Sequence, residues 1–230
     1  MLKYEEPAIE QAALSGEAYI AIPVEVYQNA AGEVQLTTYA ACEETANAFL
    51  SDYGADPFRR DALSWFAGRI DAFMAPYGYR YSPEASGVIL EYTAENDVLQ
   101  PPKVRTITIK NLDEWLQYEN KTDADPDFAS GKKGLAFAVE EKGYIVSCAC
   151  TNDAFYADGA VEIHVETAPE YQNRGFGYSC VASLISCLKD QGYKVWYKCY
   201  ETNFASAAIA QKCGLQLTGK RVSFVCYADA

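Results

Sequence analysis

A predicted strand, a glycine-rich turn and a predicted helix, in that order, constrain this chain more than any other feature. Residues 160–167 alternate apolar and polar side chains, as a half-buried strand does. The turn Gln172-Asn173-Arg174-Gly175-Phe176-Gly177 follows, and residues 178–191 have the pattern of an amphipathic helix. Free N–H groups and the dipole at a helix start favour negative charge, so the arrangement predicts a phosphate-binding site. Gly175 and Gly177 allow close backbone approach and torsions that a side chain would forbid.

Two common phosphate-binding motifs do not match this turn. It lacks the third glycine of Gly-x-Gly-x-x-Gly, which disfavours a dinucleotide-binding fold. It also lacks Gly-Lys-Ser/Thr, which excludes a nucleotide triphosphate P-loop. The remaining pattern is Gln-x-x-Gly-x-Gly, and Pro169-Glu170-Tyr171 precedes it.

A second segment with a recognisable pattern follows the predicted helix. Residues 194–200 have the composition of another strand. Residues 203–215 then predict a short helix, with Asn203 as its N-cap and Gly214 at its C-terminal end.

Together, the two segments resemble the GNAT N-acetyltransferase superfamily. Its acyl-coenzyme A (CoA) pyrophosphate loop has the pattern Gln/Arg-x-x-Gly-x-Gly/Ala, and its second signature is a helix opened by Asn and closed by Lys-x-Gly-Phe/Leu. The resemblance covers roughly residues 134–227, with a weaker lead-in from residue 103. It implies an α/β GNAT fold, with a mixed, mainly antiparallel sheet and flanking helices.

The resemblance also implies an acetyl-CoA site. No metal is expected, because Cys148-x-Cys150 is too tight for the usual zinc spacing and the chain has one histidine. In the superfamily, the strand before the loop splays away from the next strand and binds the pantetheine arm, while the loop amides bind the pyrophosphate. The cofactor-binding residues implied here are Val165, Thr167, Gln172, Asn173, Arg174, Gly175, Phe176, Gly177, Asn203 and Ser206.

Three residues of the same strand are candidates for the catalytic base that takes a proton from an amine. Glu162, His164 and Glu166 share one strand face by period-two alternation. Glu162 ranks first, because many superfamily members carry Glu at this position. His164 is the only histidine, and an unperturbed imidazole has a pKa near 6.5. The alternative is that these three side chains merely form a solvated or hydrogen-bonded strand face.

One departure from the superfamily pattern bears on activity. Ala210 stands where many members have a tyrosine that protonates the departing thiolate. An acetyl-CoA-dependent N-acetyltransferase acting on a primary amine of a small molecule, by direct attack in a ternary complex, is the favoured function. The alternative is a catalytically weak or inactive acyl-CoA-binding sensor or interaction module. The second signature also resembles a subgroup that includes antibiotic self-resistance acetyltransferases with an N-terminal extension.

The net charge and the cysteine content indicate which binding partners and which cellular compartment to expect. The formal net charge of −13 argues against nucleic acid. It is compatible with a cationic amine acceptor, although solubility is the favoured explanation of the charge. The N-terminus is too polar for a signal peptide, and no apolar run reaches the length of a membrane span. With eight cysteines and no secretory signal, a cytoplasmic location with reduced thiols is expected. A homodimer is left open.

The chain divides, on this interpretation, into an N-terminal accessory α+β region over residues 1–102 and an acetyltransferase domain over residues 103–230. Paired prolines at 101–102 indicate the linker. A polar loop is expected over residues 120–133. Further helices are expected over residues 5–16, 42–53, 57–74 and 112–118, and strands over 19–26, 33–38, 87–92, 104–109, 134–140 and 144–151.

Overall fold

The computed structural model describes residues 1–94, 102–124, 135–155 and 159–228. The chain forms two compact units. The first comprises Met1–Leu90, Tyr200–Thr202 and Thr218–Ala230, and the second comprises Glu91–Cys199 and Asn203–Leu217. A single boundary at residue 102 does not describe these units, because the C-terminal strand belongs mainly with the N-terminal residues. The predicted linker at 101–102 and the polar loop over 120–133 fall largely outside the described residues.

The first unit is a sheet with helices packed against it. The strand order is β1-β3-β2-β12, and β4 pairs with β12. β1 and β3 are parallel, while β2 is antiparallel to both β3 and β12. The bounds are β1 Leu2–Tyr4, α1 Pro7–Leu14, β2 Ile20–Asn29, β3 Val34–Thr38, η1 Ala40–Cys42, α2 Glu43–Tyr53, α3 Arg60–Met74, η2 Ala75–Tyr77, β4 Tyr79–Tyr81 and β12 Gln216–Ala228.

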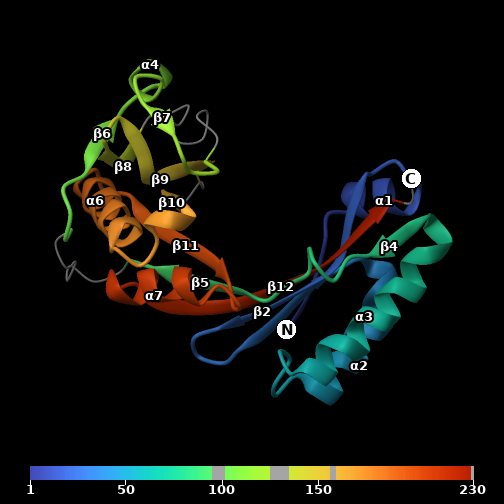
Figure 1. The fold of residues 1–230 in the computed structure, drawn as a ribbon. Helices are drawn as coiled ribbons and strands as arrows, with labels where there is room; N and C mark the ends of the chain where they lie inside the picture. The colour runs from blue at the N-terminus through green and yellow to red at the C-terminus, as the bar shows by residue number, and fades with distance from the viewer. Residues whose placement is uncertain (95–101, 125–134, 156–158, 229–230) are drawn as a thin grey trace. The chain divides into compact units, whose positions relative to one another are not determined.

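Apolar side chains of the helices and of strands β2, β3, β4 and β12 form the core of the first unit. α2 and α3 lie side by side (Figure 1). The rings of Phe49 and Phe66 stack with centroids 4.4 Å apart, and Phe66 lies 4.9 Å from Phe224 of β12. All three side chains are fully buried. Helical spacing along α3 brings its apolar residues to one face, which explains the packing.

The second unit is the mixed, mainly antiparallel sheet with flanking helices that the sequence predicts, and the predicted fold class is confirmed. The strand order is β5-β11-β10-β9-β8-β6, and β7 pairs with β9. β8, β9 and β10 are antiparallel neighbours, whereas β10 and β11 are parallel. The bounds are β5 Ile89–Thr93, β6 Ile107–Ile109, α4 Leu112–Trp115, β7 Glu119–Asn120, β8 Ala136–Glu141, β9 Tyr144–Phe155, β10 Ala160–Thr167, η3 Pro169–Tyr171, α6 Phe176–Asp190, β11 Lys194–Tyr200 and α7 Phe204–Lys212.

Helix α6 covers one face of this sheet (Figure 1). It packs against β8, β9 and β10 and also contacts α7. Its residues from Phe176 to Ala182 are all buried, because this stretch enters the core directly from the turn. The beginning of α6 and the end of β10 are therefore held in a fixed relation, and this relation builds the site.

One predicted strand is shorter in the structure. The sequence predicts a strand over residues 104–109, but β6 begins at Ile107. The N–H groups of Lys103 and Val104 instead donate to Ser179 Oγ of α6, at 3.1 Å each. Because this hydroxyl takes the two backbone donors, the segment is tied to α6 rather than to a neighbouring strand.

Two features of the structure bear on the compartment of the protein. All eight cysteines are free thiols. Across the described ranges, no helix combines the length and the apolar character that crossing a bilayer requires.

Candidate functional site

Strands β10 and β11 pair along only part of their length. Their parallel ladder runs from Ala160 and Lys194 to Ile163 and Tyr197. β10 continues to Thr167 and β11 continues to Tyr200. The last four residues of β10 therefore have an edge that β11 does not cover, as the predicted splay requires.

The backbone groups of Val165 and Thr167 point to this open edge. The N–H of Ala168 donates to Val146 O at 3.0 Å, so Ala168 faces β9. Backbone polar groups alternate sides along a strand, so Val165 and Thr167 face the other way. The carbonyl of Thr167 fits this direction, because it accepts a hydrogen bond from Gln172 Nε2 of the following turn at 3.3 Å. An extended ligand arm placed along this edge would find backbone donors and acceptors.

The turn after β10 leads directly into α6. Gly175 is the N-cap of α6 with φ +81°, and Asn173 has φ +62°. These left-handed torsions turn the chain sharply; glycine adopts them without strain, and asparagine tolerates them better than most residues. No side chain caps the start of α6. The N–H groups of Phe176 and Gly177, at the start of the helix, can therefore face an anion.

Gly177 is required for a different reason, because a side chain at this position would collide with its neighbours. A Cβ built on this residue would lie 3.0 Å from Thr167 Oγ1 and 3.2 Å from Ile209 Cδ1. The missing side chain lets α6 approach both β10 and α7 closely. Close approach, rather than an unusual torsion, is thus the role of this glycine.

Helix α7 has the capping pattern that the sequence predicts. Asn203 Oδ1 accepts a hydrogen bond from the N–H of Ser206 at 3.0 Å, which confirms the N-cap. At the other end Gly214 has φ +76°, and its N–H donates to Gln211 O while that of Leu215 donates to Ala210 O. This is a Schellman motif, and it ends α7 at a defined residue.

The open edge of β10, the turn and α7 enclose a cavity of about 350 Å³. Nine of the ten cofactor-binding residues expected from sequence line it, namely Val165, Thr167, Gln172, Asn173, Gly175, Phe176, Gly177, Asn203 and Ser206. Glu166 lines it too. The sequence reasoning did not select the other lining residues, Tyr171, Tyr178, Ala205, Ala208, Ile209 and Lys212. Four of these lie on α7 at helical spacing, a signal that could have identified them.

Arg174 is the expected residue that does not line the cavity. Its Nη2 donates to Glu170 O at 2.9 Å, and its guanidinium lies 4.9 Å from the centre of the Tyr171 ring. Tyr171 does line the cavity. The cation–π contact holds the Arg174 side chain against Tyr171, so Arg174 packs on a residue of the cavity wall without lining the cavity itself.

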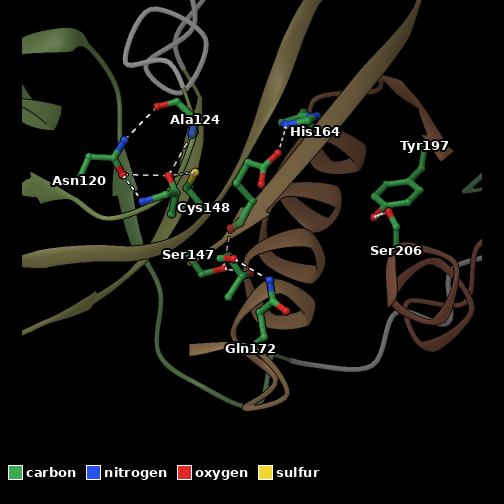
Figure 2. Close-up of polar contacts among 11 residues, drawn as sticks. Asn120, Ala124, Ser147, Cys148, His164, Gln172, Tyr197 and Ser206 are labelled. Atoms are coloured by element: carbon green, nitrogen blue, oxygen red, sulfur yellow. Dashed lines mark hydrogen bonds and ion pairs between the residues drawn. The ribbon is translucent and has the colours of Figure 1, made fainter. Parts of the chain in front are cut away.

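The three candidate bases separate into two groups. His164 Nε2 lies 2.9 Å from Glu166 Oε1, and Glu166 lines the cavity (Figure 2). Glu162 Oε2 lies 2.8 Å from Lys198 Nζ of β11. The structure thus brings His164 and Glu166 together beside the cavity and pairs Glu162 with a cation.

Two cysteines of β9 lie across from this pair but are not nucleophiles. Cys150 is opposite His164 and Cys148 is opposite Glu166. Burial raises the pKa of Cys150 to about 12, and the nearby Glu166 charge adds to the effect. Burial also raises the pKa of Cys148. Both thiols stay protonated near neutral pH, which argues against a cysteine-dependent reaction here.

Ala210 is fully buried and does not line the cavity. A buried tyrosine of the neighbouring strand instead reaches α7, because Tyr197 Oη lies 2.6 Å from Ser206 Oγ (Figure 2). Burial raises the pKa of Tyr197 well above its usual value. The phenol is therefore neutral and holds the Ser206 hydroxyl at the cavity wall.

Within the described residues, no cluster of three or more His, Cys, Asp or Glu side chains has the arrangement of a metal site. The polar groups at the site include the backbone amides of the turn, the hydroxyls of Thr167 and Ser206, and the His164–Glu166 pair.

Comparison with protein families places these elements in a known context. The family model described as GNAT acetyltransferase matches residues 106–223, which include the cavity residues of β10, the turn, α6 and α7. No match was found among curated proteins.

Among the solved structures that match, one has a TM-score of 0.50 and indicates the same fold at low sequence identity. A GNAT-family protein from Novosphingobium aromaticivorans has a TM-score of 0.50 and 18% identity, covering 66% of this chain and 69% of that chain. A GNAT-family acetyltransferase from Colwellia psychrerythraea has a TM-score of 0.47 and 12% identity, covering 61% and 59%. A Salmonella typhimurium protein whose structure contains its cofactor acetyl-CoA has a TM-score of 0.34 and 20% identity, covering 39% and 64%.

Proposed function

The chain belongs to the GNAT acetyltransferase family, and we propose that it transfers an acetyl group from acetyl-CoA to a primary amine of a small molecule, by direct attack in a ternary complex. One observation carries the proposal. The cavity is formed by the open edge of β10, the start of α6 and the capped start of α7, which are the three elements that the two sequence signatures specify.

The residues present fit acetyl-CoA. Its phosphates suit the N–H groups at the start of α6, where the helix dipole favours negative charge. Its extended arm suits the open edge at Val165 and Thr167. The absence of a side chain on Gly177 lets α6 lie against this edge. Bound acetyl-CoA supplies an activated thioester, and the protein contributes placement and proton transfer.

Proton removal from the amine is assigned to the His164–Glu166 pair. An amine attacks a carbonyl only in its neutral form, so a base must accept its proton. Glu166 lies at the cavity and holds the His164 ring through a 2.9 Å contact. Glu162, the first choice from sequence, remains a candidate, but its Oε2 accepts a hydrogen bond from Lys198 Nζ at 2.8 Å, so this oxygen is already engaged by a cation.

The departing thiolate does not need Tyr197. A thiol has a pKa near 8.5, whereas burial raises the pKa of Tyr197 above the usual tyrosine value of about 10. Proton transfer from this phenol to a thiolate is therefore uphill. The thiolate leaves as an anion or takes the proton released by the amine, and a family tyrosine at position 210 is dispensable for this chemistry.

The proposal extends to the acceptor and the compartment. The net charge of −13 suits a cationic amine, and eight free thiols suit a reducing compartment such as the cytoplasm. The pattern of α7 supports the subgroup resemblance to antibiotic self-resistance acetyltransferases, in which the residues before 103 would serve the acceptor.

Calorimetric titration with acetyl-CoA tests the cofactor site. The Gly175→Asp variant places a carboxylate where the phosphates would bind, so affinity should fall by roughly 100-fold or more, because like charges brought together cost several kcal/mol. Gly143→Asp is the matched control. Gly143 has φ +86° and open space around its missing Cβ, as Gly175 does, but it lies in the β8–β9 turn. Equal affinity of wild type and Gly175→Asp would contradict the proposed site.

Turnover is tested separately, by thiol release with a panel of primary amines. Release that depends on both acetyl-CoA and an amine supports the transferase. Tight acetyl-CoA binding without release from any amine in a broad panel would favour the sensor or interaction module instead.

A further inference from the structure

Ser147 of β9 is fully buried and lies opposite Thr167 of β10. It lies outside both sequence signatures. Its Oγ is 3.0 Å from Glu166 O and 2.8 Å from Thr167 Oγ1, and these contacts gather at the end of β10 (Figure 2). A buried hydroxyl with two such neighbours has a restricted choice of hydrogen positions.

The hydrogen positions follow from the chemistry of the partners. A carbonyl oxygen only accepts, so the Ser147 hydrogen is donated to Glu166 O. Ser147 has no second hydrogen, so Thr167 must be the donor in the bond between the two hydroxyls. The Cys180 thiol, 3.6 Å from Ser147 O and 3.8 Å from Ser147 Oγ, is a further donor to Ser147.

Thr167 Oγ1 is consequently left with lone pairs and no hydrogen for other partners. Thr167 lines the cavity, and a Cβ built on Gly177 of α6 would lie 3.0 Å from its Oγ1, so the glycine leaves no side chain over the hydroxyl. The carbonyl of Thr167 is already engaged by Gln172 Nε2. The hydroxyl is thus an oriented hydrogen-bond acceptor at the point where the open edge of β10 meets the turn.

We propose that Ser147 is a positioning residue that fixes Thr167 Oγ1 as an acceptor for an amide N–H of the bound pantetheine arm. This rests on the proposed function, because the arm is that of acetyl-CoA. An amide N–H can donate to the Thr167 hydroxyl oxygen, which acts there only as an acceptor. A ligand group that only accepts hydrogen bonds would be disfavoured at this position.

The test compares two ligands in calorimetry: acetyl-CoA and 3′-phosphoadenosine 5′-diphosphate, which lacks the arm. Thr167→Val should bind acetyl-CoA about tenfold more weakly, the value of one hydrogen bond of about 1.4 kcal/mol. It should bind the armless ligand as wild type does. Thr167→Ser retains the hydroxyl and should restore acetyl-CoA affinity. In the wild-type background, Ser147→Ala should weaken the binding of acetyl-CoA and leave the binding of the armless ligand unchanged. In the Thr167→Val background it should have no further effect, because both substitutions remove the same hydrogen bond to the arm.

The matched control is Thr93→Val on β5. Thr93 Oγ1 is buried without a hydrogen-bond partner in the described part of the chain, so this variant removes a hydroxyl from the same unit and should leave both affinities unchanged. Unchanged acetyl-CoA binding in Thr167→Val would overturn the inference, and so would equal losses for both ligands. Additive losses in the double variant would overturn the role of Ser147. If wild type binds neither ligand, the proposed function itself fails and the inference fails with it.

Discussion

Gly177 of α6 lies so close to Thr167 of β10 that a Cβ on the glycine would be 3.0 Å from the threonine Oγ1. Gly177→Ala should therefore push apart the two elements that form the cavity. Crowding of this kind costs about 1–3 kcal/mol in a well-packed region. The free energy of unfolding, measured by urea denaturation, should fall by about that amount, and acetyl-CoA affinity should fall with it.

A matched substitution separates crowding from the general effect of glycine replacement. Gly68 is exposed on α3, and nothing lies within 4 Å of the position its Cβ would take. Gly68→Ala should raise the free energy of unfolding by about 0.5–1 kcal/mol, because alanine favours the helix. If Gly177→Ala were stabilising as well, the close approach of α6 to β10 would not matter energetically.

Asn203 combines a capping role with a place in the cavity wall, and substitutions should separate the two. Asn203→Ala loses the bond to the Ser206 N–H and should reduce stability by about 1 kcal/mol. Asn203→Asp keeps a capping oxygen and should preserve stability in thermal unfolding. Its added negative charge in the cavity should nevertheless weaken acetyl-CoA binding in calorimetry. Undiminished affinity in Asn203→Asp would place the phosphates away from this end of α7.

Much of this site was predictable, because its signals are local in sequence. The Gly175 turn, the Asn203 cap and the Gly214 end each require particular residues at fixed spacing, and the structure has all three. The predicted strand over residues 194–200 agrees with β11 at both ends. Such features depend on backbone conformation and capping, which neighbouring residues determine.

Other features depend on residues far apart in the chain. Ser147 meets Thr167 only because β9 and β10 pair in one register, and a lone buried serine has no sequence pattern. Arg174 was expected at the ligand, but the Tyr171 ring holds its guanidinium. The pairing of Lys198 with Glu162 likewise follows from the register of β10 and β11. These contacts need tertiary structure, which local spacing does not supply.

The buried thiols should make the protein unstable in alkali. Burial raises the pKa values of Cys150, Cys180 and Cys213 from 9.0 to about 12. Above pH 9 the unfolded chain releases these protons while the folded chain keeps them. The stability they contribute is thus complete below pH 9 and is lost as pH rises toward 12. Each thiol should lower the free energy of unfolding by about 1.4 kcal/mol per pH unit in that window.

Urea denaturation in the presence of a reductant, at several pH values from 7 to 11, measures this slope. Cys213→Ala removes one titrating thiol and should make the slope shallower by the contribution of one proton, whatever its effect on stability at pH 7. A flat profile in the wild type would mean that the thiols ionise equally in both states.

The last prediction concerns the base. His164→Gln removes the proton-accepting imidazole and should lower kcat by about 100-fold or more, the usual contribution of general base catalysis, with little change in the KM for acetyl-CoA. Glu166→Gln should lower kcat less, because its hydrogen bond can still orient the ring. Glu162→Gln should leave kcat within a few-fold of wild type, since its carboxylate is paired with Lys198. Thiol release with an amine found in the panel measures all three variants. The opposite order, with Glu162→Gln the most damaging, would return the role of base to the residue ranked first from sequence, and would mean that the pair with Lys198 opens when substrate binds.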